Sequence, residues 1–197
     1  MLPIPDTNDF YQIVFYAAFI IWCVPELIGF FTQRPAADAQ KRDRGSRFIG
    51  VGSIWVGIVG ALWCSEHLLG ASIPWVRLPI FWIGCALLVI GTLFRWYSIR
   101  ILGQYFTRDV AVRPGQQVIQ SGPYRLIRHP SYAGGMLSML GLGLALGNWI
   151  GLALLVILPL AGYLYRMGVE EQALLDVIGE PYRDYMRRTR RLIPFVY

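Results

Sequence analysis

The chain has 197 residues, of which 55% are hydrophobic and only 15% are charged. Its mean hydropathy of +0.47 is too high for a water-soluble domain of ordinary composition. The formal net charge of +6 does not by itself indicate nucleic acid, because basic residues beside membrane helices commonly report topology and contact with anionic lipid. We therefore expect a single integral membrane domain over residues 1–197, with membrane lipids around it and no nucleic-acid partner.

Five apolar segments predict membrane-spanning helices, because about 20 apolar residues cross the hydrocarbon core. The first three are Phe10–Phe31, Phe48–Ser65 and Val76–Phe94. The last two, Tyr132–Leu146 and Trp149–Tyr165, are shorter and flank a Gly-Asn pair, a tight-turn signal that predicts a helical hairpin. The predicted fold is an all-α integral membrane protein of about five spans, with three N-terminal spans in residues 10–94 and a second half in residues 95–197.

Several polar and small residues inside these segments predict particular structural roles. Glu26, next to Pro25 in the first span, is costly in a membrane and should face a cavity or a partner that the sequence does not name. Gly141 and Gly143 in the fourth segment are expected to allow close helix packing. The three cysteines all fall inside apolar runs and lack CxxC or Cys/His spacing, so neither a metal site nor a disulfide is expected.

The basic residues predict the orientation of the chain. Seventeen of the 18 Lys and Arg lie in three segments, 34–47, 95–128 and 166–191. With five spans all three segments share one face, which the positive-inside rule makes cytoplasmic, with the N-terminus outside. The first residues carry no positive charge ahead of the first apolar run, so no cleavable signal peptide is expected.

The tail Val169–Tyr197 is expected to form two short helices. Its first part carries an apolar stripe at helical spacing, made by Ala173, Leu174, Val177 and Ile178. Gly179 suits the end of one helix and Pro181 suits the first turn of the next. Such a tail either lies on the membrane surface or folds over residues 95–131, a cytoplasmic segment that is too ordered for a plain loop.

The polar stretch QSGPYRLIRHPSYAGG, residues 120–135, stands directly before the fourth apolar segment. Pro130 fixes its own φ and restrains His129 toward extended conformations. One interpretation is a binding site in which His129 donates a hydrogen bond to an anion. The other is an interfacial cap, with Arg128 snorkelling and Tyr132 in the aromatic belt, and the residue types alone favour this cap. His67, in the short outer loop, is expected to have no functional role.

A second polar group follows the fifth apolar segment. Arg166 ends that segment, and Glu170 and Glu171 follow about one helical turn later. The group is either an intrahelical ion pair with acids near the start of the next helix, or an anion clamp beside a carboxylate that binds a cation. Both interpretations remain open from the residues alone.

In this order and spacing, the motifs resemble the isoprenylcysteine carboxyl methyltransferase family. The similarity rests on Val118–Tyr124, on Arg128-His129-Pro130-Ser131-Tyr132 with Gly134, and downstream on Arg166, Glu170-Glu171, Gly179-Glu180, Tyr182, Tyr185 and Pro194-Phe195. It covers about Leu102–Phe195, roughly half of the chain. Phospholipid methyltransferases share the paired glutamates and the general layout.

The resemblance implies S-adenosylmethionine as the methyl donor and a lipidic or amphiphilic acceptor that enters from the bilayer. The cofactor would lie between the segment before the hairpin, the hairpin and the folded-back tail. Cofactor-binding roles are implied for Tyr124, Arg128, His129, Pro130, Tyr132, Glu170, Glu171 and Tyr182, and catalytic roles for Arg166 and Glu170. The expected reaction is methylation of a carboxylate, which Arg166 would hold in line.

Two other functions are the alternatives. A membrane reductase of the sterol-reductase type would use NADPH, which suits a basic cytoplasmic face, although the short chain and the motif spacing favour methyl transfer. A non-enzymatic membrane scaffold would use its charged residues for topology alone, and it would not be stabilised by any nucleotide-like ligand.

Overall fold

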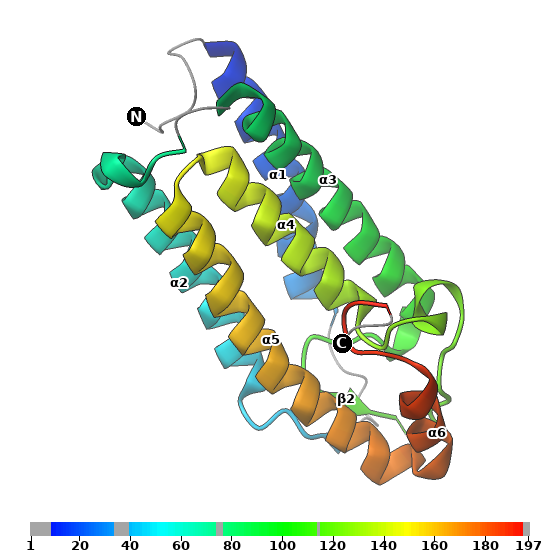
Figure 1. Ribbon diagram of the computed structural model, residues 1–197. Coiled ribbons are helices and arrows are strands. Elements are labelled where there is room, and N and C mark those ends of the chain that lie inside the picture. Colours follow the sequence, from blue (N-terminus) through cyan, green and yellow to red (C-terminus); the bar gives the residue numbers. More distant parts are fainter. Residues whose placement is uncertain (1–8, 34–39, 74–76, 114, 195–197) are drawn as a thin grey trace.

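The computed structural model describes residues 9–33, 40–73, 77–113 and 115–194, which form a bundle of long helices with a polar region at one end (Figure 1). The helices are α1 (Asp9–Thr32), α2 (Ser46–His67), α3 (Arg77–Leu102), α4 (Pro130–Leu146), α5 (Trp149–Ile178) and α6 (Glu180–Arg188). Two short strands, β1 (Gln40–Lys41) and β2 (Ala111–Val112), pair antiparallel. Single 3₁₀ turns cover Leu69–Ala71, Gly103–Tyr105 and Gly122–Arg125.

The helices confirm the predicted class, an all-α protein that passes through the membrane several times. In the part of the chain that the structure describes, α1, α2, α3 and α5 are long and apolar enough to cross a membrane. Helix α4 has 17 residues, which is about 26 Å at 1.5 Å per residue and slightly less than a core of about 30 Å. A fifth crossing through α4 therefore stays a prediction.

Two helices run further than the sequence analysis predicted. Helix α3 continues past Phe94 to Leu102, because Arg95 finds a carboxylate partner, Glu26, within the bundle. Helix α5 continues to Ile178, because no proline interrupts it after Arg166. The prediction of a separate short helix after Val169 was therefore wrong, and the predicted apolar stripe belongs to the last turns of α5.

The predicted close packing at the two glycines is confirmed. A Cβ atom at Gly141 would lie 2.6 Å from the carbonyl oxygen of Gly84 in α3, and one at Gly143 would lie 2.9 Å from the Cα atom of Leu152 in α5. Helix α4 is thus held between α3 and α5 with backbones in near contact.

The predicted tight turn between α4 and α5 is also confirmed. Gly147 adopts φ 65°, a left-handed conformation that costs glycine little. The buried Asn148 caps α5 by accepting from the Gly151 amide (3.0 Å), and its Nδ2 donates to the Cys64 and Leu68 carbonyls at 3.2 and 3.0 Å. The hairpin is therefore fastened to the end of α2.

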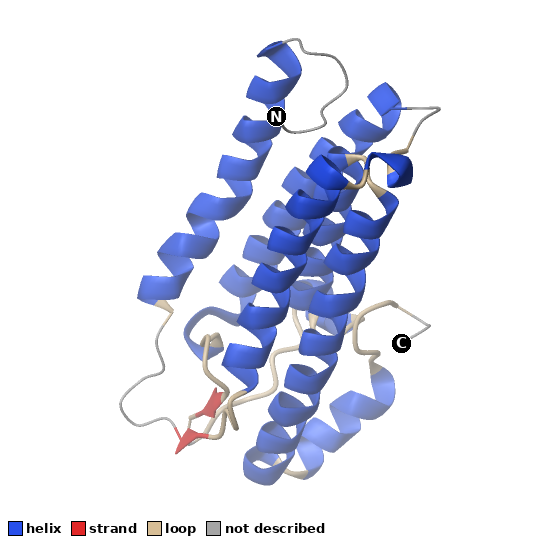
Figure 2. Cartoon of the chain, turned by 90° about the vertical axis from the view of Figure 1, so that its left-hand side faces the viewer, coloured by secondary structure: helices blue, strands red, loops and turns tan. Residues whose placement is uncertain are grey.

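The described parts of the three basic segments meet at the end of the bundle opposite this turn (Figures 1 and 2). Pairing of β1 with β2 joins the segment before α2 to the segment after α3. The tail lies along the segment before α4, since the Arg128 amide donates to the Arg190 carbonyl at 2.7 Å and the His129 amide to the Arg191 carbonyl at 3.0 Å. This end of the molecule contains the polar cavities.

Candidate functional site

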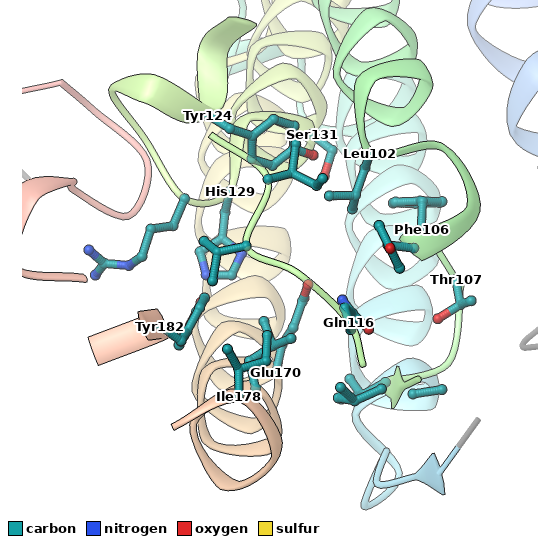
Figure 3. A pocket seen from close by; sticks show the side chains of 18 of the residues that line it. Leu102, Phe106, Thr107, Gln116, Tyr124, His129, Ser131, Glu170, Ile178 and Tyr182 are labelled. Carbon is teal, nitrogen blue, oxygen red and sulfur yellow. The ribbon is translucent and has the colours of Figure 1, made fainter. Parts of the chain in front are cut away.

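A pocket of about 820 Å³, counted with the part that is open to solvent, lies between the segment before α4, the last turns of α5, and α6. Seven of the predicted site residues line it: Tyr124, Arg128, His129, Tyr132, Arg166, Glu170 and Tyr182. Figure 3 shows Tyr124 and His129 on one side, with Phe106 and Thr107 from the segment after α3 on the other. Apolar contact comes from residues such as Val112, Leu174 and Ile178.

The remaining two predicted residues stand beside the pocket. Pro130 is fully buried and begins α4, where its fixed φ suits the first turn. It therefore sets the direction of the helix. Glu171 is 3% exposed, and it faces the segment before α4 and the tail.

Glu171 is the centre of a buried ion-pair network. Its carboxylate accepts from Arg128 Nε at 2.8 Å and from Arg191 Nη2 at 2.7 Å, and it lies 3.2 Å from His129 Nε2. A carboxylate can only accept, so the contact with His129 places a proton on Nε2. The network joins three segments that are far apart in sequence: α5, the segment before α4, and the tail.

Arg128 is hydrogen-bonded to the tail. Besides Glu171, its guanidinium donates from Nη1 to the Met186 carbonyl at 3.1 Å and to the Thr189 carbonyl at 2.5 Å. These bonds satisfy carbonyl groups at the end of α6, where cations are favoured. The side chain thus both lines the pocket and holds the tail against it.

A chain of three side chains crosses the pocket floor. The Tyr132 hydroxyl donates to Glu170 Oε2 at 2.8 Å and accepts from Arg166 Nε at 2.7 Å. Arg166 also donates from Nη2 to the Arg108 carbonyl at 2.5 Å. Glu170 Oε1 makes no hydrogen bond with the residues that the structure describes, so one carboxylate oxygen stays available to a ligand.

The sequence analysis missed Asp43, which anchors Arg166. Its Oδ1 accepts from the Val110 amide (3.1 Å) and the Ser46 hydroxyl (2.9 Å), and lies 3.4 Å from Arg166 Nη1. Burial favours the neutral acid, but these hydrogen bonds, one from the Arg47 amide and the charge of Arg166 together hold the pKa of Asp43 below its ordinary value. Asp43 stands among basic residues of an expected loop, and no local signal marks it.

Two tyrosines that line the pocket, Tyr124 and Tyr182, stay neutral. Burial raises the pKa of Tyr124 and of Tyr182 above the ordinary value, and the charge of Glu170 adds to the shift. Two phenol rings that stay uncharged are suited to cover a flat or cationic ligand group.

A second cavity of about 500 Å³ borders the first. Tyr132 and Arg166 line both cavities, together with Phe106 and Thr107. The partner of Glu26 that the sequence could not name is found here: Glu26 accepts from Arg95 Nε at 2.5 Å and from Arg108 Nη2 at 3.0 Å. The intramembrane acid is therefore paired with two cations.

The part of the chain that is similar to known proteins contains the candidate site. The sequence model of the family described as phospholipid methyltransferase matches residues 79–180, which include the site from Tyr124 to Glu171. Protein-S-isoprenylcysteine O-methyltransferase B of Arabidopsis thaliana is 27% identical over 121 residues, 59% of this chain and 61% of that protein. The probable protein-S-isoprenylcysteine O-methyltransferase of Oryza sativa subsp. indica is 26% identical over 137 residues, 66% of this chain and 71% of that protein.

A relative that is named for a different acceptor is also similar. Methanethiol S-methyltransferase of Pseudomonas deceptionensis is 27% identical over 146 residues, which are 72% of this chain and 52% of that protein. The resemblance found in the sequence is thus confirmed, within a family whose members act on more than one kind of acceptor.

Proposed function

The chain belongs to the phospholipid methyltransferase family, which makes it a membrane methyltransferase, and we propose that it transfers the methyl group of S-adenosylmethionine to a carboxylate of a lipidic acceptor. The observation that carries the proposal is the first pocket. Its polar groups include Glu170 Oε1, which no described residue occupies, and the neutral phenols of Tyr124 and Tyr182. A pocket of this size, with aromatic walls and an available carboxylate oxygen, suits a ligand that is flat at one end and cationic at the other.

The side chains present fit the cofactor. Glu170 would face a positive group, since a carboxylate oxygen lacking a donor is favoured beside a cation. His129 is 4% exposed, and its Nε2 is engaged by Glu171, so Nδ1 is the ring atom left for a ligand. Tyr124 and Tyr182 would cover the adenine or the sulfonium, and the apolar side chains of Leu174 and Ile178 complete the wall.

Arg128, Pro130 and Glu171 support the site by position. Glu171 fixes the ring of His129 and the guanidinium of Arg128, and Pro130 fixes the start of α4. Each constrains a group that lines the pocket, which matters because alignment within a fraction of an ångström governs transfer rates. We therefore assign these three as positioning residues of the cofactor site.

The proposed reaction needs no strong general base from the protein. S-adenosylmethionine supplies a methyl group on a positively charged sulfur. Arg166, held by Asp43 and Tyr132 at the junction of the two cavities, would orient the acceptor carboxylate in line with that group. Because a carboxylate is already a nucleophile, orientation and exclusion of water provide most of the catalysis.

The orientation in the membrane follows from charge. We propose that the polar end of the bundle faces the cytoplasm, with the N-terminus outside and with α4 and α5 as the fourth and fifth crossings. The gathering of the three basic segments at one end supports this orientation. The acceptor would then reach the site from the cytoplasmic leaflet.

Titration calorimetry with S-adenosylhomocysteine tests the cofactor site. We expect the detergent-purified protein to bind this product, and His129→Ala to weaken binding roughly tenfold or more, the effect of a lost hydrogen bond to a charged group. His67→Ala is the matched control, because His67 stacks on Trp63 near the opposite end of the bundle. Failure of the wild type to bind, or equal binding by a stably folded His129→Ala protein, would contradict the proposal.

A further inference from the structure

A third cavity lies at the start of α2, at the polar end of the bundle (Figure 1). Its volume is about 700 Å³, counted with the part that is open to solvent. Its described walls come from the turn before α2, from α2 and from the segment after α3: Arg42, Asp43, Arg44, Gly45, Arg47, Phe48 and Asp109. None of these residues was assigned above to the cofactor or to the methyl acceptor.

The charge that this cavity presents to a ligand is positive. Three arginines line it, Arg42, Arg44 and Arg47, together with two acids, Asp43 and Asp109. Each acid is only 7% exposed, and each accepts hydrogen bonds from other groups of the protein. Arg44 is exposed and the other two arginines are half-buried. A ligand in the cavity therefore meets guanidinium groups rather than carboxylates.

Arg44 has a backbone conformation that is unfavourable for arginine. Its φ is 47° and that of Gly45 is 75°, and the left-handed region is costly for a residue that has a Cβ atom. The Arg44 carbonyl accepts from the Tyr165 hydroxyl of α5 at 3.5 Å. The Arg44 guanidinium makes no hydrogen bond or ion pair with the residues that the structure describes. Folding alone would favour glycine here, so the charged side chain points to a ligand.

Arg47 contributes a second guanidinium to the same cavity. Its Nη1 donates to Asp109 Oδ1 at 3.2 Å, and its guanidinium carbon lies 4.9 Å from the centre of the Phe30 ring in α1. Within the described parts of the chain, Nε and Nη2 of Arg47 make no hydrogen bond. Guanidinium groups with donors to spare are suited to the oxygens of a phosphate group.

The apolar neighbours of these arginines place the cavity where α2 enters the membrane. Phe48 lines the cavity and is 81% exposed, and the adjacent Ile49 is 48% exposed. Both lie in the first turn of α2, a helix long and apolar enough to cross a membrane. Exposed apolar side chains beside clustered arginines are typical of contact with a lipid that has an anionic headgroup.

We infer that the third cavity binds the phosphate group of an anionic phospholipid, with Arg44 and Arg47 as donors and Phe48 against an acyl chain. A lipid is favoured over a free phosphate because the cations and the exposed aromatic ring line one cavity at the start of a helix that can cross the membrane. The lipid is bound and is not methylated. The inference therefore goes beyond the proposed function and does not depend on it.

Native mass spectrometry of the delipidated protein in detergent tests the inference without any methyl donor. Dioleoyl phosphatidylglycerol and dioleoyl phosphatidylcholine, which have the same chains but differ in headgroup charge, would be titrated separately. We expect the first phosphatidylglycerol to bind at least about fivefold more tightly, the contribution of one basic residue near an anionic surface. Arg44→Gln should remove this preference. Arg187→Gln, an equal charge change in an exposed pair with Asp184 on α6, should keep it.

A glycine variant separates recognition from structure. Because the Arg44 backbone is left-handed, Arg44→Gly should not lower the unfolding temperature of the lipid-free protein, yet it should remove the preference for phosphatidylglycerol. An arginine that serves folding alone predicts the reverse, a lower unfolding temperature and an unchanged preference.

Three results would overturn the inference. The first is equal affinity of the wild type for the two lipids, and the second is an equal effect of Arg44→Gln and Arg187→Gln on the preference. The third is competition by glycerol phosphate, which has no acyl chains, at the concentration of the lipid itself, because the site would then bind soluble phosphates. Since S-adenosylhomocysteine takes no part in this assay, each of these results leaves the proposed function standing.

Discussion

Glu171→Gln separates the tail from the pocket while preserving the shape of the side chain. The carboxylate of Glu171 is met by Arg128, His129 and Arg191 at 2.8, 3.2 and 2.7 Å. A hydrogen bond that involves a charged group contributes about 1.5–3 kcal/mol, and a bond between two opposite charges lies at the upper end of that range, so each contact loses ~1 kcal/mol when the carboxylate becomes an amide. Three contacts give ~3 kcal/mol, or an increase of about a hundredfold in the population with an open tail.

Limited trypsin digestion in nanodiscs measures this opening. Arg190 lies in the tail and its amide is bonded to the Leu126 carbonyl, so cleavage after Arg190 requires detachment. When opening is fast relative to cleavage, the rate follows the open population, and we expect it to rise about a hundredfold for Glu171→Gln. S-adenosylhomocysteine should slow cleavage of both proteins, because ligand binding favours the closed form.

Glu180→Gln is the matched control, since Glu180 forms an exposed pair with Arg183 at the start of α6, and exposed pairs contribute little. Equal cleavage rates for Glu171→Gln and Glu180→Gln would refute the assignment of Glu171 as the residue that holds the tail.

Three further predictions concern other parts of the molecule. Tyr132→Phe removes the hydroxyl that lies between the buried Arg166 and the half-buried Glu170, so methyl transfer in a labelled-donor assay should fall roughly 10- to 100-fold with little change in S-adenosylhomocysteine affinity. Tyr165→Phe, exposed on α5, should match the wild type. The pKa of Asp43 is lower in the folded than in the unfolded protein. The Asp43 carboxylate therefore contributes its full stability above the unfolded pKa of about 3.9, and this contribution is lost as pH falls through the folded pKa. Thermal unfolding at a series of acidic pH values should show that the unfolding temperature of Asp43→Asn falls less with pH than that of the wild type. A Cβ at Gly91 would lie 2.6 Å from a backbone amide of α4 and one at Gly168 would touch nothing within 4 Å, so Gly91→Ala should destabilise by ~1–3 kcal/mol and Gly168→Ala should not, as denaturant titration would show.

The long apolar helices could be predicted because each carries its own signal. The first two predicted spans end within two residues of α1 and α2. The predicted spans that were ended at a charged residue were shorter than the helices α3 and α5. Arg95 and Arg166 look like the ends of apolar runs, but both are buried against carboxylates, Glu26 and Asp43, that lie 69 and 123 residues away. Such pairing over long sequence distances has no local pattern.

In the candidate site, too, the local motifs could be predicted and the long-range contacts could not. The RHPSY stretch and the paired glutamates are local, and both lie at the pocket. The separate directions of Glu170 and Glu171 could not be read from adjacent positions, because only the packing of the tail decides which carboxylate is enclosed. Asp43 and Arg191, which hold Arg166 and Glu171, became visible only when the chain was folded.

A thermal-stability titration of the purified protein with S-adenosylmethionine, S-adenosylhomocysteine and NADPH, run side by side, tests the methyltransferase assignment most directly. A ligand that binds the native state stabilises it by ~2.7 kcal/mol at a hundredfold excess over its dissociation constant. We expect the first two ligands to raise the unfolding temperature and NADPH to leave it unchanged. Stabilisation by NADPH alone, or a flat response of the folded protein to all three, would contradict the assignment.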